Sequence, residues 1–211
     1  MPGSKVGVGV LVSGAGTNLR AILEASTAPG YPAEVVAVAS NRPGCLALEI
    51  ARNAGVPVRS FPATTFSGDV EARDRAMAAW LFEKGVSLLV LAGYDRIITR
   101  PLLRAFPERV LNLHNSLLPA FAGTMSAVQA ALDHGVKVTG CTVHLVDENY
   151  LDGGPIVLQA AVTVEDNDSA ESLLERIHAR EWRILPEAIA LLARGEIKVQ
   201  GRRVLRVDTV R

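Results

Sequence analysis

Short apolar runs of strand length recur along the first half of the chain, and stretches with apolar residues at helical spacing lie between most of them. The predicted strands are 5–12, 34–40, 56–61, 87–92 and 110–113, and the predicted helices are a segment that starts near Leu19, 46–53, 70–84 and 100–105. Runs that are apolar throughout are typical of strands buried on both faces. Their alternation with helices predicts a Rossmann-like, doubly wound and mostly parallel α/β sheet.

Small polar residues, glycine and proline mark the ends of several elements. Thr17 or Asn18 is placed to cap the first helix. Gly85 follows the third helix at its C′ position, and Pro101 opens the fourth. The polar stretch 63–69 is predicted as a loop.

The pattern changes after residue 115. The predicted elements are a helix over 126–134, β segments over 138–146 and 155–164, a helix over 169–193 and a β-ribbon over 196–204. We expect the two β segments to pair antiparallel, because only an acidic loop ending in glycine, 147–154, joins them. The long helix is predicted to be interrupted at Pro186 and stopped by Gly195.

The composition fits one folded domain. The chain has 211 residues, of which 49% are hydrophobic and 21% charged, which is ample for a core and argues against disorder. We predict a single domain over 1–211, with a nucleotide-binding half, 1–115, and a smaller C-terminal α+β subdomain, 116–211.

Charge and cysteine content narrow the partners. Lys plus Arg equals Asp plus Glu at 22 each, so there is no electrostatic case for nucleic acid or an anionic membrane. Cys45 and Cys141 are predicted to be reduced and mostly buried thiols. No secretory leader and no run of about 18 apolar residues occurs, so we expect a soluble, cytoplasmic protein. The sequence does not decide the oligomeric state, and a homodimer stays open.

The turn that follows the first strand, Ser13-Gly-Ala-Gly-Thr-Asn18, can hold an anion. Backbone N–H groups at a helix N-terminus bind phosphate, and Gly14 and Gly16 allow close approach. Leu19 stands where a dinucleotide fingerprint needs its third glycine, and no P-loop lysine follows. A monophosphate is therefore favoured over NAD or ATP, with a merely structural turn as the alternative.

Asn112 and His114 are the first catalytic candidates. They lie two residues apart at the end of a predicted strand and so project to one face. Histidine can act as an acid or base, and asparagine can donate to an oxyanion. Asp152, from the 147–154 loop, would stabilise the imidazolium if that loop folds over this strand end. The alternative is three unrelated polar residues. His144 has no such partner pattern and is predicted to be structural.

Ligands in doubly wound sheets bind outside the carboxyl ends of the strands. The Gly14 turn, the loop at Gly93 and the Asn112–His114 pair all follow predicted strands, so we expect them to converge on one cleft. No cluster of His, Cys or Asp has metal-ligand spacing, and no metal is predicted.

Several stretches together are similar to one family. They are Val10-Leu-Val-Ser-Gly-Ala-Gly-Thr-Asn-Leu19, Val90-Leu-Ala-Gly-Tyr94, Leu111-Asn-Leu-His-Asn-Ser-Leu-Leu-Pro-Ala-Phe121 and Leu151-Asp-Gly-Gly-Pro-Ile156. Over nearly its whole length the chain resembles the phosphoribosylglycinamide formyltransferases, folate-dependent enzymes of de novo purine biosynthesis. The resemblance implies the formyltransferase fold and transfer of a formyl group from 10-formyltetrahydrofolate, as co-substrate, to the amine of 5-phosphoribosylglycinamide.

The resemblance also implies roles for named residues. On the ribonucleotide side, Gly16, Thr17 and Asn18 would bind the 5′-phosphate, and Glu181 the ribose. At the reaction centre, Asn112 and protonated His114 would stabilise the oxyanion, with Asp152 supporting His114. On the folate side, the pterin would lie against Asp95, Arg96, Ile97 and Ile98, beside Asn112 and the 148–154 loop.

The chain departs from the family pattern mainly on the folate side. Asp95 stands where a hydrophobic residue is usual, and Val70 where an arginine is usual, with Arg73 as a substitute. Asn115 replaces a proline, and Ser126 lies where a histidine is usual. Relative to the family pattern, we expect one inserted residue within 124–126 and a second insertion within 148–152.

Three other functions remain in view. One is formyl transfer to another amine, of the sugar-nucleotide type. The second is a formyltetrahydrofolate hydrolase, which would carry a regulatory domain before the catalytic half. The third is a non-catalytic nucleotide-binding regulator on the same fold.

Overall fold

The computed structural model describes residues 4–149 and 151–207. The first three residues of the chain, Tyr150 of the predicted acidic loop and the last four residues lie outside the described part. The chain divides into two compact units, Met1–Leu111 and Asn112–Arg211. The boundary falls inside strand β5 (Val110–His114).

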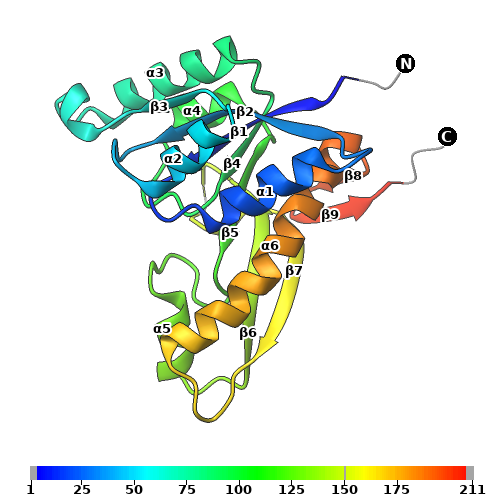
Figure 1. Cartoon of the computed structure of the whole chain (residues 1–211). Coiled ribbons are helices and arrows are strands. Elements are labelled where there is room, and N and C mark those ends of the chain that lie inside the picture. Colours follow the sequence, from blue (N-terminus) through cyan, green and yellow to red (C-terminus); the bar gives the residue numbers. More distant parts are fainter. Residues whose placement is uncertain (1–3, 150, 208–211) are drawn as a thin grey trace. The chain divides into compact units, whose positions relative to one another are not determined.

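The first unit is a parallel sheet with helices on both faces. Its strands are β1 (Val6–Val12), β2 (Ala33–Ser40), β3 (Val58–Ser60) and β4 (Leu88–Leu91), in the spatial order β3-β2-β1-β4. Its helices are α1 (Thr17–Thr27), α2 (Leu46–Asn53), the short 3₁₀ helix η1 (Ala63–Phe66), α3 (Val70–Glu83) and α4 (Arg100–Ala105). All three strand pairings are parallel. Figure 1 shows α1 and α2 on one face of these strands and α3 and α4 on the other.

β1 occupies an inner position because its residues suit burial on both faces. Val10, Leu11 and Val12 are fully buried. A Cβ atom at Gly7 would lie 2.2 Å from the carbonyl oxygen of Gly85, so only glycine fits that close approach. The apolar run in the sequence therefore reports a strand covered from both sides, and the predicted mostly parallel α/β class is confirmed.

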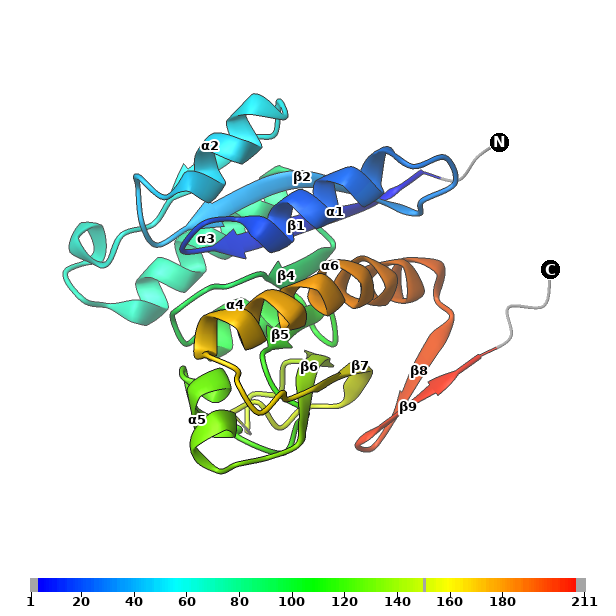
Figure 2. The same cartoon turned by 60° about the horizontal axis from the view of Figure 1, so that its bottom comes forward.

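The second unit combines an antiparallel strand pair with one long helix. Its elements after β5 are α5 (Ala127–Asp133), β6 (Val138–Leu145), β7 (Ile156–Thr163), α6 (Ala170–Arg194), β8 (Ile197–Gln200) and β9 (Arg203–Arg206). β6 and β7 pair antiparallel, as predicted, and α6 packs on both. β8 and β9 form the predicted ribbon, which follows α6 directly (Figure 2).

Helix α6 runs unbroken through Pro186, so the predicted interruption is wrong. A proline inside a helix removes one backbone donor and costs about 3 kcal/mol. Pro186 itself and its neighbours Leu185, Ala188 and Ile189 are buried, and burial of this apolar face offsets that cost. The helix ends at Gly195, in the left-handed conformation with φ 68°, as predicted.

Two further predictions of local structure are wrong. The N-cap position of helix α1 is Gly16, which has no side chain to cap the helix. The predicted caps, Thr17 and Asn18, already lie within the helix. The stretch 63–69 is not a simple loop, because Ala63–Phe66 forms η1. Among the described residues, no helix is both long and apolar enough to cross a membrane.

Candidate active site

The second unit brings the three predicted catalytic residues together at the end of β5. The distance from His114 Nε2 to Asp152 Oδ2 is 3.3 Å. The amide of Asn112 donates to the other carboxylate oxygen, Asp152 Oδ1, across 3.3 Å. His114 is only 7% exposed, and Asn112 and Asp152 beside it are half-buried.

The backbone around Asp152 explains how the carboxylate reaches β5. Asp152 has a left-handed backbone, φ 51°, which costs most residues about 1–2 kcal/mol but is tolerated by Asp. Gly123 N–H donates to Asp152 Oδ2 across 3.0 Å. A Cβ atom at Gly154 would lie 1.8 Å from the Leu145 carbonyl oxygen, so this glycine is required where the loop meets the end of β6.

Asp152 is held as a carboxylate. Burial would raise its pKa, but the His114 side chain, the Gly123 N–H group and the nearby His144 together hold the pKa below its ordinary value. The cluster therefore contains a fixed negative charge beside the imidazole of His114.

Ser116 fixes the orientation of the His114 ring, and sequence reasoning missed it. Ser116 Oγ lies 3.0 Å from His114 Nδ1 and donates its own proton to the Ala120 carbonyl across 2.5 Å. Ser116 Oγ must therefore accept a hydrogen from Nδ1. His114 Nε2 is buried and faces Asp152 Oδ2 at 3.3 Å, without a hydrogen bond to any described residue.

His144 lies against the same cluster, although its sequence context shows no partner pattern and predicts a structural residue. Its Nε2 atom lies 3.1 Å from Asn112 Nδ2 and 3.7 Å from Asp152 Oδ1, and the residue is 1% exposed. The available signal was its place near the end of β6. The sequence alone does not indicate that the end of β6 lies beside the end of β5.

Glu181 is buried in α6 at 1% exposure and accepts a hydrogen bond from Asn115 Nδ2 across 2.7 Å. Asn115 is the residue that replaces the family's usual proline. It follows β5 directly and so ties the predicted ribose-binding carboxylate to the strand that carries Asn112 and His114.

In the first unit, the predicted phosphate turn has the form of an uncapped helix N-terminus. Gly16 has φ 78° and offers no side-chain acceptor to the first turn of α1, and backbone N–H groups at such a helix start can bind an anion. A Cβ atom at Gly16 would lie 2.8 Å from Ala47 Cβ, so glycine is required for packing as well. A cavity of about 430 Å³ adjoins this turn, lined by Ser13–Ala15, Arg42 and Gly44–Leu46.

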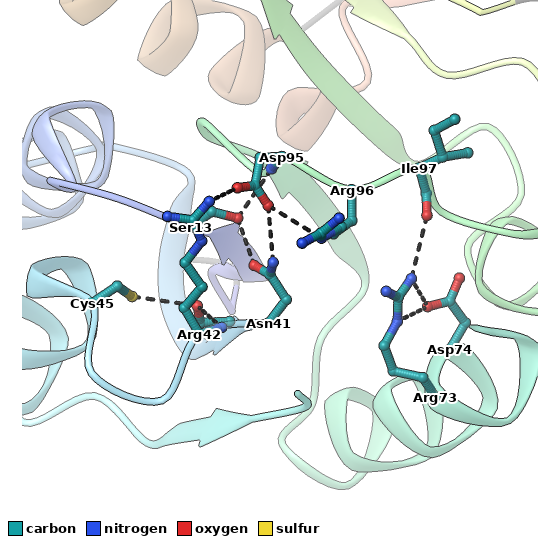
Figure 3. Close-up of polar contacts among 10 residues, drawn as sticks. Ser13, Asn41, Arg42, Cys45, Arg73, Asp74, Asp95, Arg96 and Ile97 are labelled. Carbon is teal, nitrogen blue, oxygen red and sulfur yellow. Dashed lines mark hydrogen bonds and ion pairs between the residues drawn. The ribbon is translucent and has the colours of Figure 1, made fainter. Parts of the chain in front are cut away.

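The unexpected carboxylate of Asp95 is paired with neighbouring polar groups (Figure 3). Asp95 accepts from Asn41 Nδ2 across 2.8 Å and forms an ion pair with Arg42, while its backbone N–H donates to Ser13 Oγ across 3.0 Å. Burial would raise the pKa of Asp95, but the hydrogen bond from Asn41, the neighbouring Ser13 hydroxyl and the charge of Arg42 hold the pKa below its ordinary value. The carboxylate thus anchors the start of the predicted folate loop.

Arg73 does not replace the arginine missing at Val70. It is 4% exposed and donates to Asp74 Oδ1 across 2.9 Å and to the Ile97 carbonyl across 3.2 Å, as Figure 3 shows. Asp74 in turn accepts from the Thr99 N–H and hydroxyl groups at 2.6 and 2.8 Å. Arg73 and Asp74 therefore hold the 95–98 loop from α3, while the side chain of Ile97 is 71% exposed.

Comparison with known proteins identifies the family. The formyl transferase family model matches residues 7–189. A phosphoribosylglycinamide formyltransferase of Mycobacterium tuberculosis is 46% identical over 92% of this chain and 87% of its own length. The crystal structure of glycinamide ribonucleotide transformylase 1 from Symbiobacterium toebii has a TM-score of 0.93 and 48% identity, covering 97% of this chain and 95% of that one.

A longer relative matches over a small part of its length. The trifunctional purine biosynthetic protein adenosine-3 of Gallus gallus is 41% identical over 93% of this chain, which spans only 19% of that protein. The resemblance read from the sequence is confirmed by all three comparisons. The chain belongs to the formyl transferase family.

Proposed function

We propose that this enzyme transfers the formyl group of 10-formyltetrahydrofolate to the amine of 5-phosphoribosylglycinamide, a step of purine (IMP) biosynthesis. The observation that carries the proposal is the cluster of Asn112, His114 and Asp152 at the end of β5. The names of relatives that match this chain over most of their own length give the substrates.

The substrate amine attacks the formyl carbon, and the electrons of the carbonyl bond move to its oxygen. His114, protonated on Nε2, and the amide of Asn112 stabilise the oxyanion. Its collapse restores the carbonyl and breaks the bond to the folate nitrogen, which takes a proton while the amine loses one. Asp152 favours the charged imidazole and accepts from the water that relays this proton.

Asn112 can donate to the oxyanion only by giving up one contact seen in the structure. Its Nδ2 group faces His144 Nε2 at 3.1 Å and Asp152 Oδ1 at 3.3 Å. The longer contact, to Asp152, is the one that a formyl oxygen replaces. His114 and His144 are buried, at 7% and 1% exposure, and exclusion of bulk water around them limits loss of the formyl group by hydrolysis.

The ribonucleotide is held through its phosphate and ribose. Gly16, Thr17 and Asn18, at the uncapped start of α1, bind the 5′-phosphate, and Glu181 accepts from the ribose hydroxyls. The domain 1–211 acts as one formyltransferase unit, in keeping with a family match that runs through both compact units.

The folate lies against Asp95, Arg96, Ile97 and Ile98, with Asn112 at its formyl end. The backbone of this loop is held by Asp95 at one end and by Arg73 and Asp74 at the other, so its carbonyl and N–H groups are fixed for reading the pterin edge. The only partners proposed are these small molecules, no metal takes part, and a cytoplasmic location stays a prediction.

The test is formyl transfer by wild type, His114→Ala and the control His134→Ala, each with 10-formyltetrahydrofolate and phosphoribosylglycinamide. His134 is exposed and lies outside the cluster. We expect kcat to fall about 100-fold or more in His114→Ala and to stay near wild type in the control. Equal kcat values in His114→Ala and His134→Ala would show that His114 does not have the assigned role. Formyl transfer to a sugar amine would replace phosphoribosylglycinamide as the proposed acceptor. Hydrolysis of 10-formyltetrahydrofolate without transfer would replace the proposed reaction.

A further inference from the structure

The hydrogen bonds of His144 define which ring nitrogen carries its proton. His144 Nδ1 lies 3.0 Å from the carbonyl oxygen of Leu145, and a carbonyl can only accept. Nδ1 therefore carries a hydrogen. In the neutral ring the other nitrogen, Nε2, then has a free lone pair, and this lone pair faces Asn112.

The carboxamide of Asn112 is consequently placed between two acceptors. One is the His144 Nε2 lone pair at 3.1 Å, and the other is the Asp152 carboxylate at 3.3 Å. Only the NH₂ group of a carboxamide can satisfy both, because its oxygen would face a lone pair and a negative charge. The orientation of Asn112 thus follows from the chemistry of its neighbours.

We propose that neutral His144 is a positioning residue for formyl transfer: it holds the amide nitrogen of Asn112 toward the reaction centre. This inference rests on the proposed function. When the formyl oxygen displaces Asp152 from one amide hydrogen, the bond to His144 keeps the other hydrogen in place. The donor then meets the oxyanion without having to reorient.

Protonation of His144 would disturb this arrangement. A hydrogen on Nε2 would face the NH₂ group, so the Asn112 oxygen would have to turn toward His144 while Asp152 still requires the nitrogen. The buried surroundings oppose that protonation. Burial lowers the pKa of His144, against the Leu145 carbonyl and the charge of Asp152, and the charge of His114 lowers it further.

The kinetic test compares His144→Gln with His144→Leu. Gln can present a carbonyl oxygen close to where Nε2 lies, whereas Leu fills similar space and accepts nothing. We expect kcat to fall about 10- to 100-fold in His144→Leu, with both KM values within about threefold of wild type. His144→Gln should recover most of that loss. Equal kcat values in wild type and His144→Leu would overturn the proposal.

A double-mutant cycle separates positioning from a general loss of structure. If His144 acts through Asn112, adding His144→Leu to Asn112→Ala causes little further loss of kcat. If the two losses multiply, His144 acts by another route and the inference is wrong.

A readout without catalysis keeps the inference apart from the choice of substrate. In ¹⁵N-labelled wild-type protein at neutral pH, the His144 ring should show a protonated Nδ1 and an unprotonated Nε2. Two Asn112 side-chain N–H signals should shift in His144→Leu and return toward wild type in His144→Gln. A proton on Nε2 contradicts the inference even when transfer is normal. A protein that shows the expected signals but formylates another amine contradicts only the proposed function.

Discussion

At the scale of single residues, the reaction centre is a set of side chains whose hydrogen-bonding roles are assigned by their neighbours. Ser116 donates its hydroxyl proton to the Ala120 carbonyl and so accepts from His114. Asp152 stays charged, although it is half-buried, because the groups around it hold its pKa below the ordinary value. Each group then has one orientation that satisfies all of its contacts. Such preorganisation lets the site meet developing charge without rearrangement.

Asp152→Asn tests the charge in this set with little effect on the backbone. Asn tolerates the left-handed conformation that Asp152 adopts, so the loop should keep its shape. The Asp152 carboxylate accepts from Asn112 at one oxygen and from Gly123 N–H at the other, whereas an Asn side chain has only one oxygen. The NH₂ group of the new Asn would therefore face one of these two donors. We expect kcat to fall about 100-fold.

The control for Asp152→Asn is Asp133→Asn, an exposed residue at the end of α5, which should keep wild-type kcat. Thermal unfolding of both variants should stay within a few degrees of wild type. A wild-type rate in Asp152→Asn would show that the carboxylate charge is not needed for transfer.

At the scale of elements, the sequence pattern located most helices and strands but not all of their ends. Helices α2 and α4 begin and end where the apolar spacing, proline and glycine predict. The cap of α1 was missed because Gly16 takes a conformation set by its packing against Ala47, which lies on another helix. Local rules cannot report a constraint that comes from a distant segment.

The N-terminus of α1 yields a prediction about phosphate. Thr17→Asp places a carboxylate at the first helical residue, where it interacts favourably with the helix dipole but repels an anion. We expect the Kd for phosphoribosylglycinamide to rise at least about tenfold, with the folate Kd nearly unchanged. Calorimetric titration of each ligand measures both values.

Thr27→Asp, at the exposed end of the same helix, is the matched control and should bind both ligands as wild type does. Thr17→Asp should also be at least as stable as Thr27→Asp, because the dipole favours a negative charge only at the start of the helix. Unchanged ribonucleotide binding in Thr17→Asp would place the phosphate elsewhere.

At the scale of the whole molecule, buried ionisable groups predict how stability depends on pH. His144 has a lowered pKa in the folded state, so the unfolded chain binds its proton first, and stability falls as pH drops below the ordinary value of 6.5. Asp152 also has a lowered pKa, so its contribution is present above the ordinary value of 3.8 and is lost as pH falls below it.

At alkaline pH, stability falls as pH rises, because buried groups with raised pKa values ionise in the unfolded chain first. Burial raises the pKa of Cys141 and of Tyr94 to about 12 each. Their contributions are therefore complete below the ordinary values, 9.0 for Cys and 10.0 for Tyr, and are lost as pH rises above them.

Urea unfolding across pH should show a free energy of unfolding that declines on both sides of a plateau near neutrality. His144→Gln should flatten the slope just below pH 6.5, the ordinary value for histidine, and a slope like that of wild type would contradict this assignment.

The sequence predicted the class of fold, and the structure brings the predicted trio of Asn112, His114 and Asp152 together, but the surroundings of that trio were not predicted. Asn112 and His114 were found because two polar residues interrupt an apolar strand. His144 and Ser116 were missed because an isolated polar residue gives no local sign of its partner. Asp95 looked out of place for the same reason, since Arg42 and Asn41, which hold it, come from the end of another strand.

The close contact of Gly154 with Leu145 also bears on how this enzyme can evolve. Asp152 is tied to Gly123 on one side, and the chain is pressed against β6 at Gly154 on the other. Both of these contacts lie outside the segment between Asp147 and Asp152, where the resemblance to the family places an insertion. A change in the length of that segment can therefore leave the anchors of the Asp152 carboxylate in place.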